Sequence, residues 1–167
     1  KTLPYSPDES ESRLRERLRL MCIWWASPEQ ALCKECHNRG LEAREDEGHQ
    51  DLLCRLLFDE CKSCFDSFGI PSERLGDYRA CLNLSAEWHG IEKLSHRDKV
   101  RRYLDMGLSS APPEPELSER LCKVQLWFHL PFPELQKDCR RYNVNSIAKE
   151  DARQDLVAQL VGKLWGD

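Results

Sequence analysis

Apolar residues recur three or four positions apart through most of this chain, which is the spacing of a helix with one buried face. The first such stripe falls between residues 11 and 26 and contains Leu14, Leu18, Met21 and Trp25, with Leu20, Ile23 and Trp24 beside it. Val, Ile and Thr are scarce, and no segment alternates between apolar and polar residues as a half-buried strand does. The pattern therefore predicts an all-α fold.

The same spacing predicts further helices, which are bounded by prolines, glycines and capping residues. They are expected near residues 29–39, 49–68, 72–89, 95–106, 116–130, 133–142 and 153–164. In the segment 49–68 the expected inward stripe is Leu53, Leu57, Cys61, Cys64 and Phe68, with Leu52 and Leu56 beside it. In the segment 116–130 the expected stripe is Leu117, Leu121, Val124 and Phe128.

Individual residues set several of these helix limits. Ser27 is expected to cap a helix that opens with Pro28, because proline fits the first helical turn, and Gly40 is expected to end it. Ser72 is expected to cap another helix, which runs as far as Gly90.

One helix, loop and helix unit, residues 130–161, organises the end of the chain. Pro133 opens its first helix, and Leu135 and Cys139 share one face of that helix. Asn143 followed by an apolar residue is typical of a helix C-cap. The second helix begins near Arg153, and its expected buried stripe is Leu156, Val157, Leu160, Val161 and Leu164.

This unit has relatives upstream in the same chain. Residues 27–57 repeat its pattern, and residues 95–121 repeat it more loosely, because Lys99 and Tyr103 replace expected apolar residues. A shift of 103 residues also aligns positions 14–41 with the later unit without a gap. The identical residues include Leu14, Arg17, Leu18, Trp24, Pro28, Leu32 and Cys36, which recur as Leu117, Arg120, Leu121, Trp127, Pro131, Leu135 and Cys139. We therefore expect the chain to begin inside a repeat of a longer precursor.

The recurring unit resembles the SAP-type helix-loop-helix motif, with apolar or cysteine positions, a small turn residue and a closing Asp-Leu-Val-x-x-Leu. Tandem units of this kind, with the interposed segment GIPSERLGDYRACLNLSAEWHGIEKLS, resemble repeats of proteins from dinoflagellate algae. The resemblance implies tandem short helix, extended loop, helix units with an inserted helical segment. The expected divisions are a tail and closing helix of a partial repeat (1–26), unit one (27–68), a helical connecting segment (69–94), divergent unit two (95–129) and unit three (130–167).

Composition narrows the classes of function. A chain of 167 residues with 40% hydrophobic residues can bury a core, while 32% charged residues leave no transmembrane segment. A net charge of −4 and a pI of about 5.8 give no overall attraction for nucleic-acid backbones. The chain lacks an initial Met and a secretory hydrophobic segment, which favours a processed chain or a fragment.

Nine cysteines, an odd number, lie among apolar neighbours, which favours reduced thiols in a reducing compartment. Cys33 with Cys36 and Cys61 with Cys64 have the C-x-x-C spacing of zinc ligands or of a redox pair. Both pairs lie in helical patterns, without turns that would direct their sulfurs towards one metal. Core cysteines are therefore favoured over a zinc site and over a redox pair, and we expect no metal or cofactor.

No pattern in the chain indicates catalysis. The histidines do not form a spaced ligand set, and no acidic pair stands out as a general acid and base. Phosphate-loop, dinucleotide-binding and nucleophile-elbow motifs do not occur. We expect no catalytic residues and no enzyme activity.

Nucleic-acid binding is the alternative function, because some SAP motifs bind DNA. The basic residues that would serve it form two clusters, one of Arg97, Lys99, Arg101 and Arg102 and one of Lys137, Arg140 and Arg141. The loops at residues 42–47 and 114–116 carry acidic residues, which repel phosphate. Solvated helix faces and salt bridges to these loops are therefore the favoured explanation of both clusters.

Our leading expectation is a non-enzymatic accessory or structural subunit that docks on a larger protein assembly through helical repeat surfaces. The candidate partner-binding residues are Trp24, Trp25, Trp127, Phe128 and Trp165, of which some are expected to lie in the core. The algal resemblance implies a plastid photosynthetic complex, with the chain on the stroma side and peripheral to the membrane. A soluble reducing compartment is the other expected location.

Overall fold

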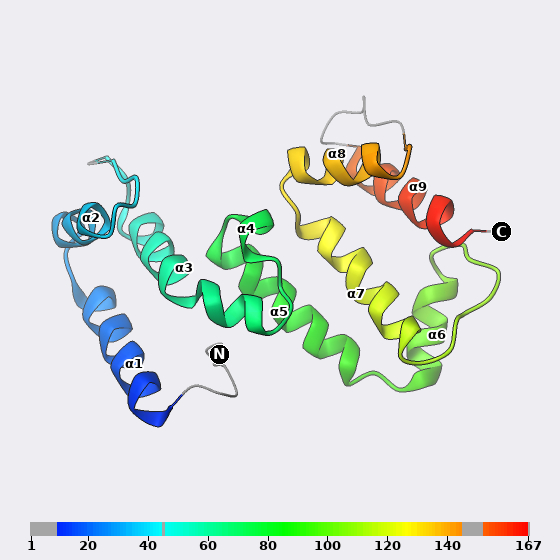
Figure 1. Cartoon of the computed structure of the whole chain (residues 1–167), viewed down its shortest axis with the longest axis horizontal. Coiled ribbons are helices and arrows are strands. Elements are labelled where there is room, and N and C mark those ends of the chain that lie inside the picture. The colour runs from blue at the N-terminus through cyan, green and yellow to red at the C-terminus, as the bar shows by residue number, and fades with distance from the viewer. Residues whose placement is uncertain (1–9, 45, 145–151, 167) are drawn as a thin grey trace. The chain divides into compact units, whose positions relative to one another are not determined.

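The computed structural model describes residues 10–44, 46–144 and 152–166 of the chain. Within these ranges it contains nine α-helices and no strand, which confirms the predicted all-α fold (Figure 1). The chain divides into two compact units, Lys1–Leu82 and Asn83–Asp167. The expected tail at residues 1–9 and the loop residues 145–151 lie outside the described residues.

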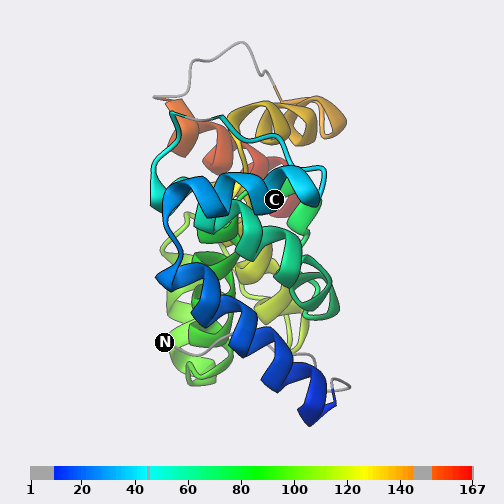
Figure 2. The same cartoon turned by 90° about the vertical axis from the view of Figure 1, so that its left-hand side faces the viewer.

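The first unit is built on α1 (Glu11–Ala26), α2 (Glu29–Asn38) and α3 (His49–Ser67), followed by the single turn α4 (Ser72–Leu75) and the start of α5 (Tyr78–Glu92). Both α1 and α2 pack against α3, and a short link joins α1 to α2 (Figure 2). Apolar side chains from all three helices form one cluster, which contains Trp24, Leu32, Cys33, Cys36, Leu52, Leu53 and Leu56.

The second unit contains the rest of α5, then α6 (His96–Leu104), α7 (Glu116–His129), α8 (Phe132–Arg141) and α9 (Arg153–Trp165). Helix α7 packs against both α6 and α9, and α8 packs against α9 (Figure 1). The fully buried side chains of this unit include Leu84, Ile91, Tyr103, Leu117, Leu121, Trp127, Leu135 and Leu160.

The helix triplets α1–α2–α3 and α7–α8–α9 have matching limits. Helices α2 and α8 start and end at residues that differ by 103, and α3 and α9 start at residues that differ by 104. Gly40 after α2 and Asn143 after α8 both adopt positive φ, at 70° and 56°. These are the two residue types that most readily take this conformation at a helix C-terminus, as the sequence predicts.

Two predicted features of helix starts are wrong. Pro28, not Ser27, is the N-cap residue of α2, and α2 has no side-chain cap. The Ser27 hydroxyl instead donates to the carbonyl of Ile23 at 2.7 Å. It therefore serves the C-terminus of α1, where carbonyl groups lack helical partners.

The helix predicted from Ser72 to Gly90 is divided into α4 and α5. Gly76 adopts a φ of 65°, which ends α4 after one turn because this conformation cannot continue a right-handed helix. The Ser72 hydroxyl donates to Asp66 at 2.7 Å and so does not cap the helix. Gly90 lies inside α5 and does not end it.

Candidate interaction surface

Two of the five predicted partner-binding residues, Trp24 and Trp127, are core residues. They occupy equivalent places in α1 and α7 and are 4% and 0% exposed. The Trp127 indole donates to the Asp138 carboxylate at 2.9 Å, and the Arg39 guanidinium lies 4.7 Å from the centre of the Trp24 ring. Burial and these internal contacts remove both tryptophans from the candidate surface.

Trp165 is half-buried at the end of α9. Its ring centre lies 5.7 Å from that of Trp127 and 6.4 Å from that of Tyr103. The Arg120 guanidinium lies 5.3 Å from the Trp165 ring centre. Trp165 therefore joins α6, α7 and α9 inside the second unit, and partner binding is not needed to explain it.

Trp25 and Phe128 are the two predicted residues that remain exposed, at 66% and 39%. Each directly follows the buried tryptophan of its helix, so successive aromatic residues point inwards and outwards. Phe128 was expected in the inward stripe of its helix, and this expectation is wrong because Trp127 takes the inward position.

The inward face of α1 also differs from the predicted one. Its buried residues are Arg17, Met21 and Trp24, whereas Leu18 is 36% exposed and Trp25 lies largely in solvent. Arg17 reaches into the unit and donates to the Cys64 thiol. Arg17 thus occupies part of the inward face, and Leu18 and Trp25 of the expected stripe are exposed.

The exposed side of α1 forms a continuous surface, which we call the open face. Residues three, four and seven positions apart lie on one side of a helix, and all members of this set are exposed. The open face consists of Arg15, Leu18, Arg19, Cys22, Trp25 and Ala26. Sequence reasoning identified only Trp25 among them as a partner-binding residue.

The corresponding side of α7 is covered by α5. The Trp88 indole donates to the carbonyl of Cys122 at 2.9 Å, and the Glu87 carboxylate lies 3.1 Å from the His129 ring nitrogen. The residues of α7 that correspond to the open face by the 103-residue shift are Ser118, Leu121, Cys122, Gln125, Phe128 and His129. Cys122 and His129 of this set thus contact α5 through polar groups.

Helix α6 covers the same side of α7. Lys99, although only 8% exposed, keeps polar partners, because its ammonium donates to the Ser118 hydroxyl at 2.9 Å and to Glu114 at 3.1 Å. The Lys99 hydrogen bond is the main cause that lowers the pKa of Glu114. The Tyr103 hydroxyl accepts from Arg120. Helix α6 is therefore held against α7 by several hydrogen bonds.

Equivalent leucines are more deeply buried on α7, which α5 and α6 contact, than on α1. Leu121 of α7 is 1% exposed, while its counterpart Leu18 of α1 is 36% exposed. Leu117 is fully buried, while its counterpart Leu14 is only half-buried. The open face of α1 is therefore exposed to solvent, whereas the corresponding surface of α7 is buried within the second unit.

Both lysines of the two basic clusters pair with carboxylates, whereas the arginines are exposed. Lys99 is buried and paired with Glu114, which is a salt bridge to an acidic loop of the kind expected. Lys137 pairs with Glu134 one turn earlier in α8. Arg140 and the other arginines of the clusters are exposed on their helices.

The two C-x-x-C pairs lie in the core of the first unit, as the favoured interpretation predicts. Cys33, Cys36, Cys61 and Cys64 are all less than 9% exposed, with Cys36 and Cys61 fully buried. Burial raises the pKa of Cys36, which disfavours the thiolate that a metal or a redox reaction requires. In the part of the chain that the structure describes, no group of three or more His, Cys, Asp or Glu side chains could hold a metal ion.

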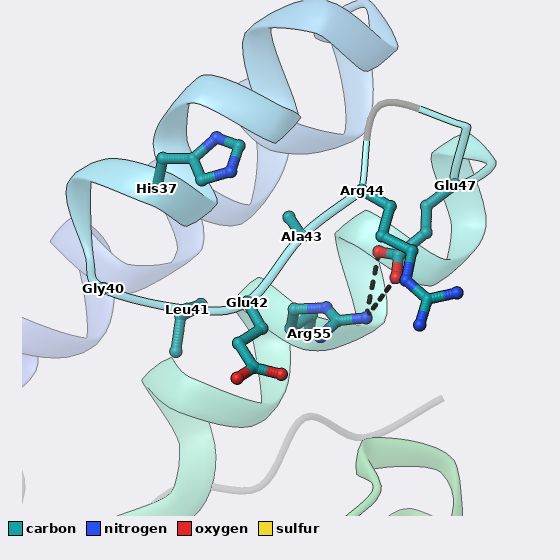
Figure 3. Close-up of a pocket in the computed structure, with 8 residues that line it drawn as sticks. All are labelled: His37, Gly40, Leu41, Glu42, Ala43, Arg44, Glu47 and Arg55. Atoms are coloured by element: carbon teal, nitrogen blue, oxygen red, sulfur yellow. Dashed lines mark hydrogen bonds and ion pairs between the residues drawn. The ribbon is translucent and has the colours of Figure 1, made fainter.

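An open pocket of about 580 Å³ lies between α2, α3 and their connecting loop (Figure 3). Arg55 from α3 contacts both carboxylate oxygens of Glu47, at 2.7 and 2.9 Å. Arg44 and Glu42 add one charge of each sign to the lining. Because Glu47 neutralises Arg55 and the remaining charges are mixed, this pocket indicates neither an anion site nor a cation site.

Known proteins do not identify the chain. Comparison with protein-family models, with curated proteins and with solved structures finds no match to it. In the described residues, every helix is too short or too polar to cross a membrane. The function must therefore be argued from the open face and from its covered counterpart.

Proposed function

We propose that this protein is a non-enzymatic accessory or structural subunit that docks on a larger protein assembly through the open face of α1. The observation that carries this proposal is the exposure of Leu18 and Trp25 on one side of a helix whose counterpart in α7 is covered. Exposed apolar side chains that lie together on a surface commonly mark protein interaction sites. A tryptophan is also among the residues that contribute most to binding energy.

Several further observations support an interaction role. The thiols of Cys36, Cys81, Cys122 and Cys139 have raised pKa values because of burial, so they are poor nucleophiles. The pocket beside α2 carries balanced charges, with Arg44 and Arg55 set against Glu42 and Glu47. The resemblance to algal repeats makes a plastid photosynthetic complex the assembly that we would examine first.

Native purification tests the proposal. The protein is fractionated by size from its source, with and without nuclease, and the proteins that migrate with it are identified by mass spectrometry. We expect it to migrate in a large protein complex that nuclease does not disturb. Loss from a heavy fraction only after nuclease treatment would instead support the SAP-like nucleic-acid-binding module.

Matched variants tie the result to the open face. Leu18→Glu and Trp25→Glu place a charge on that face, and both should release the protein from the complex. Ile23→Glu is the control, because Ile23 is 51% exposed on α1 but lies about 140° and about 160° around the helix from Leu18 and Trp25. Equal release by all three variants would contradict docking through the open face.

A further inference from the structure

We infer that an acidic amphipathic helix of a partner protein covers the open face of α1, placed on α1 as α5 and α6 are placed on α7. This inference rests on the proposed function and names the chemistry of the partner. Its basis is the surface of α7 that α5 and α6 cover, because α7 occupies the place of α1 in the matching helix triplet.

The contacts on α7 define where such a helix would lie. Trp88 and Lys99 contact Cys122 and Ser118, and these α7 positions correspond to Arg19 and Arg15 of α1. A further contact involves Gln125. With its side-chain amide oriented so that both ends find partners, Gln125 accepts from Arg102 at 2.8 Å and donates to Glu87. Its counterpart is Cys22, which is exposed.

The open face of α1 is more positive than the matching surface of α7. Glu114, in the loop before α7, pairs with Lys99 of α6, and its counterpart on α1 is also acidic, Glu11. Two arginines of the open face replace uncharged residues of α7: Arg15 and Arg19 stand in the places of Ser118 and Cys122. A helix that covers α1 must therefore supply carboxylates where α6 supplies cations.

The two carboxylates of α1, on Glu11 and Glu16, leave these arginines accessible to a partner. Glu11 pairs with Arg15 at 2.7 Å, but both side chains are about three-quarters exposed. Such a pair contributes little and remains accessible to a partner. Among the described residues, Arg19 has no ion-pair partner.

A second copy of the chain is a poorer occupant of this surface. Two open faces packed together would bring the arginines of both copies into one interface, where like charges repel. Helix α6 of another copy carries Arg97, Lys99, Arg101 and Arg102, and so it also has the wrong sign. An acidic helix with an aromatic residue at the position of Trp88 matches both the positive charge and the apolar side chains of the open face.

Extended forms of the full chain test this chemistry. Residues 83–103 are duplicated directly ahead of Lys1. Each copied residue then precedes α1 by as many residues as its original precedes the corresponding position of α7. One form carries the natural copy, and the other carries Lys99→Glu and Arg102→Glu within the copy. Linking the probe to the chain raises its effective concentration, so that a weak contact becomes measurable.

The readout is the rate at which iodoacetamide modifies Cys22, measured by peptide mass spectrometry. We expect the acidic copy to slow this reaction at least about tenfold relative to the unextended chain, which corresponds to a covered state favoured about ten to one. The natural copy should protect Cys22 much less. Arg15→Glu with Arg19→Glu should reverse the order of the two copies.

Controls separate docking from misfolding. Leu18→Glu in the acidic form should restore the Cys22 rate, whereas Ile23→Glu should leave the protection unchanged. Cys33 and Cys36 should stay unmodified in every form, because both are buried in the core of the first unit.

Three results would overturn the inference. Equal or better protection by the natural copy would show that the face accepts a helix but not an acidic one. A lack of protection by both copies would show that the open face does not bind a helix of this kind. A fall in the Cys22 rate of the unextended chain at higher protein concentration, with a doubled mass, would identify a second copy as the occupant. The proposed function is judged separately, by native migration in a complex.

Discussion

Helices α1 and α7 begin from nearly the same pattern and have different surroundings. Each buries one tryptophan, at Trp24 and Trp127, and each places an aromatic residue outwards immediately afterwards. On the neighbouring side, α7 buries Leu121 beneath α5 and α6, while α1 leaves Leu18 in solvent. The burial of an apolar residue is therefore decided by which helix lies beside it, and not by its own helix alone.

The largest expected difference between α1 and α7 comes from a carboxylate placed at the two equivalent leucines. Leu121→Asp should destabilise the second unit by about 4 kcal/mol or more, because it leaves a charge in a core. Leu18→Asp should cost less than about 1 kcal/mol, because that side chain already contacts water. Urea unfolding with hydrogen exchange resolved by peptide reports the two units separately, and similar costs would show that Leu18 is as buried as Leu121.

The paired aromatic residues give the next largest difference. Trp24→Ala should destabilise the first unit by about 3 kcal/mol, because it removes a buried indole from the core that α1 shares with α2 and α3. Trp25→Ala should change the free energy of unfolding by about 0.5 kcal/mol or less. Thermal unfolding of both variants measures this contrast, and a large loss from Trp25→Ala would mean that Trp25 packs inside the unit.

These contrasts show which parts of the fold the sequence could predict. The helices and most of their limits follow from periodicity and capping, because these signals depend on residues within one or two turns. Ser95, for example, accepts from the Asp98 amide as the sequence predicts, and Gly69 ends its helix with a φ of 74°. Such local signals need no knowledge of the tertiary packing.

Other features depended on contacts across the fold. The expected stripe of Leu14, Leu18, Met21 and Trp25 was only partly correct, because Arg17 reaches Cys64 on α3 and occupies part of the inward face. The apolar content of α1 alone could not distinguish two adjoining faces of the same helix. Tertiary packing selected between them.

The open face itself had a signal that sequence reasoning did not use. The 103-residue alignment places Arg15 and Arg19 opposite Ser118 and Cys122, which are neutral. Only the contacts of these two residues with α5 and α6 show that the replaced positions belong to an interface. A change of charge between repeats becomes informative once one repeat is seen with its cover in place.

A smaller contrast concerns the residues that follow α2 and α8. Gly40 and Asn143 share the left-handed conformation, and no described residue other than its chain neighbours lies within 4 Å of the position that a Cβ atom would occupy at Gly40. Gly40→Ala should therefore cost about 1 kcal/mol from backbone strain alone. Gly40→Asn should cost clearly less, since asparagine already serves in the second unit. Equal costs in urea unfolding would contradict this equivalence.

The smallest expected effect is a pH dependence of the contact between α6 and α7. Glu114 has a pKa below its ordinary value of 4.5, chiefly because Lys99 of α6 donates to it. A lowered pKa in the folded state means that the pair stabilises the fold above the ordinary value. This contribution is lost as pH falls through the pKa of the folded state.

Acidification from about pH 6 to about pH 3 should therefore loosen α6 from α7. Amide hydrogen exchange in α6, corrected for its intrinsic pH dependence, should become faster, and Glu114→Gln should abolish the change. Glu114 lies at a largely solvated site, so the effect is modest and should weaken further at high salt. The matching variant Glu11→Gln in α1 should leave protection in the first unit nearly unchanged, because its pair with Arg15 is exposed and holds no covering helix. A pH response that persists in Glu114→Gln would mean that groups other than Glu114 hold α6 against α7. The Lys99–Glu114 pair would then no longer support an acidic partner for α1.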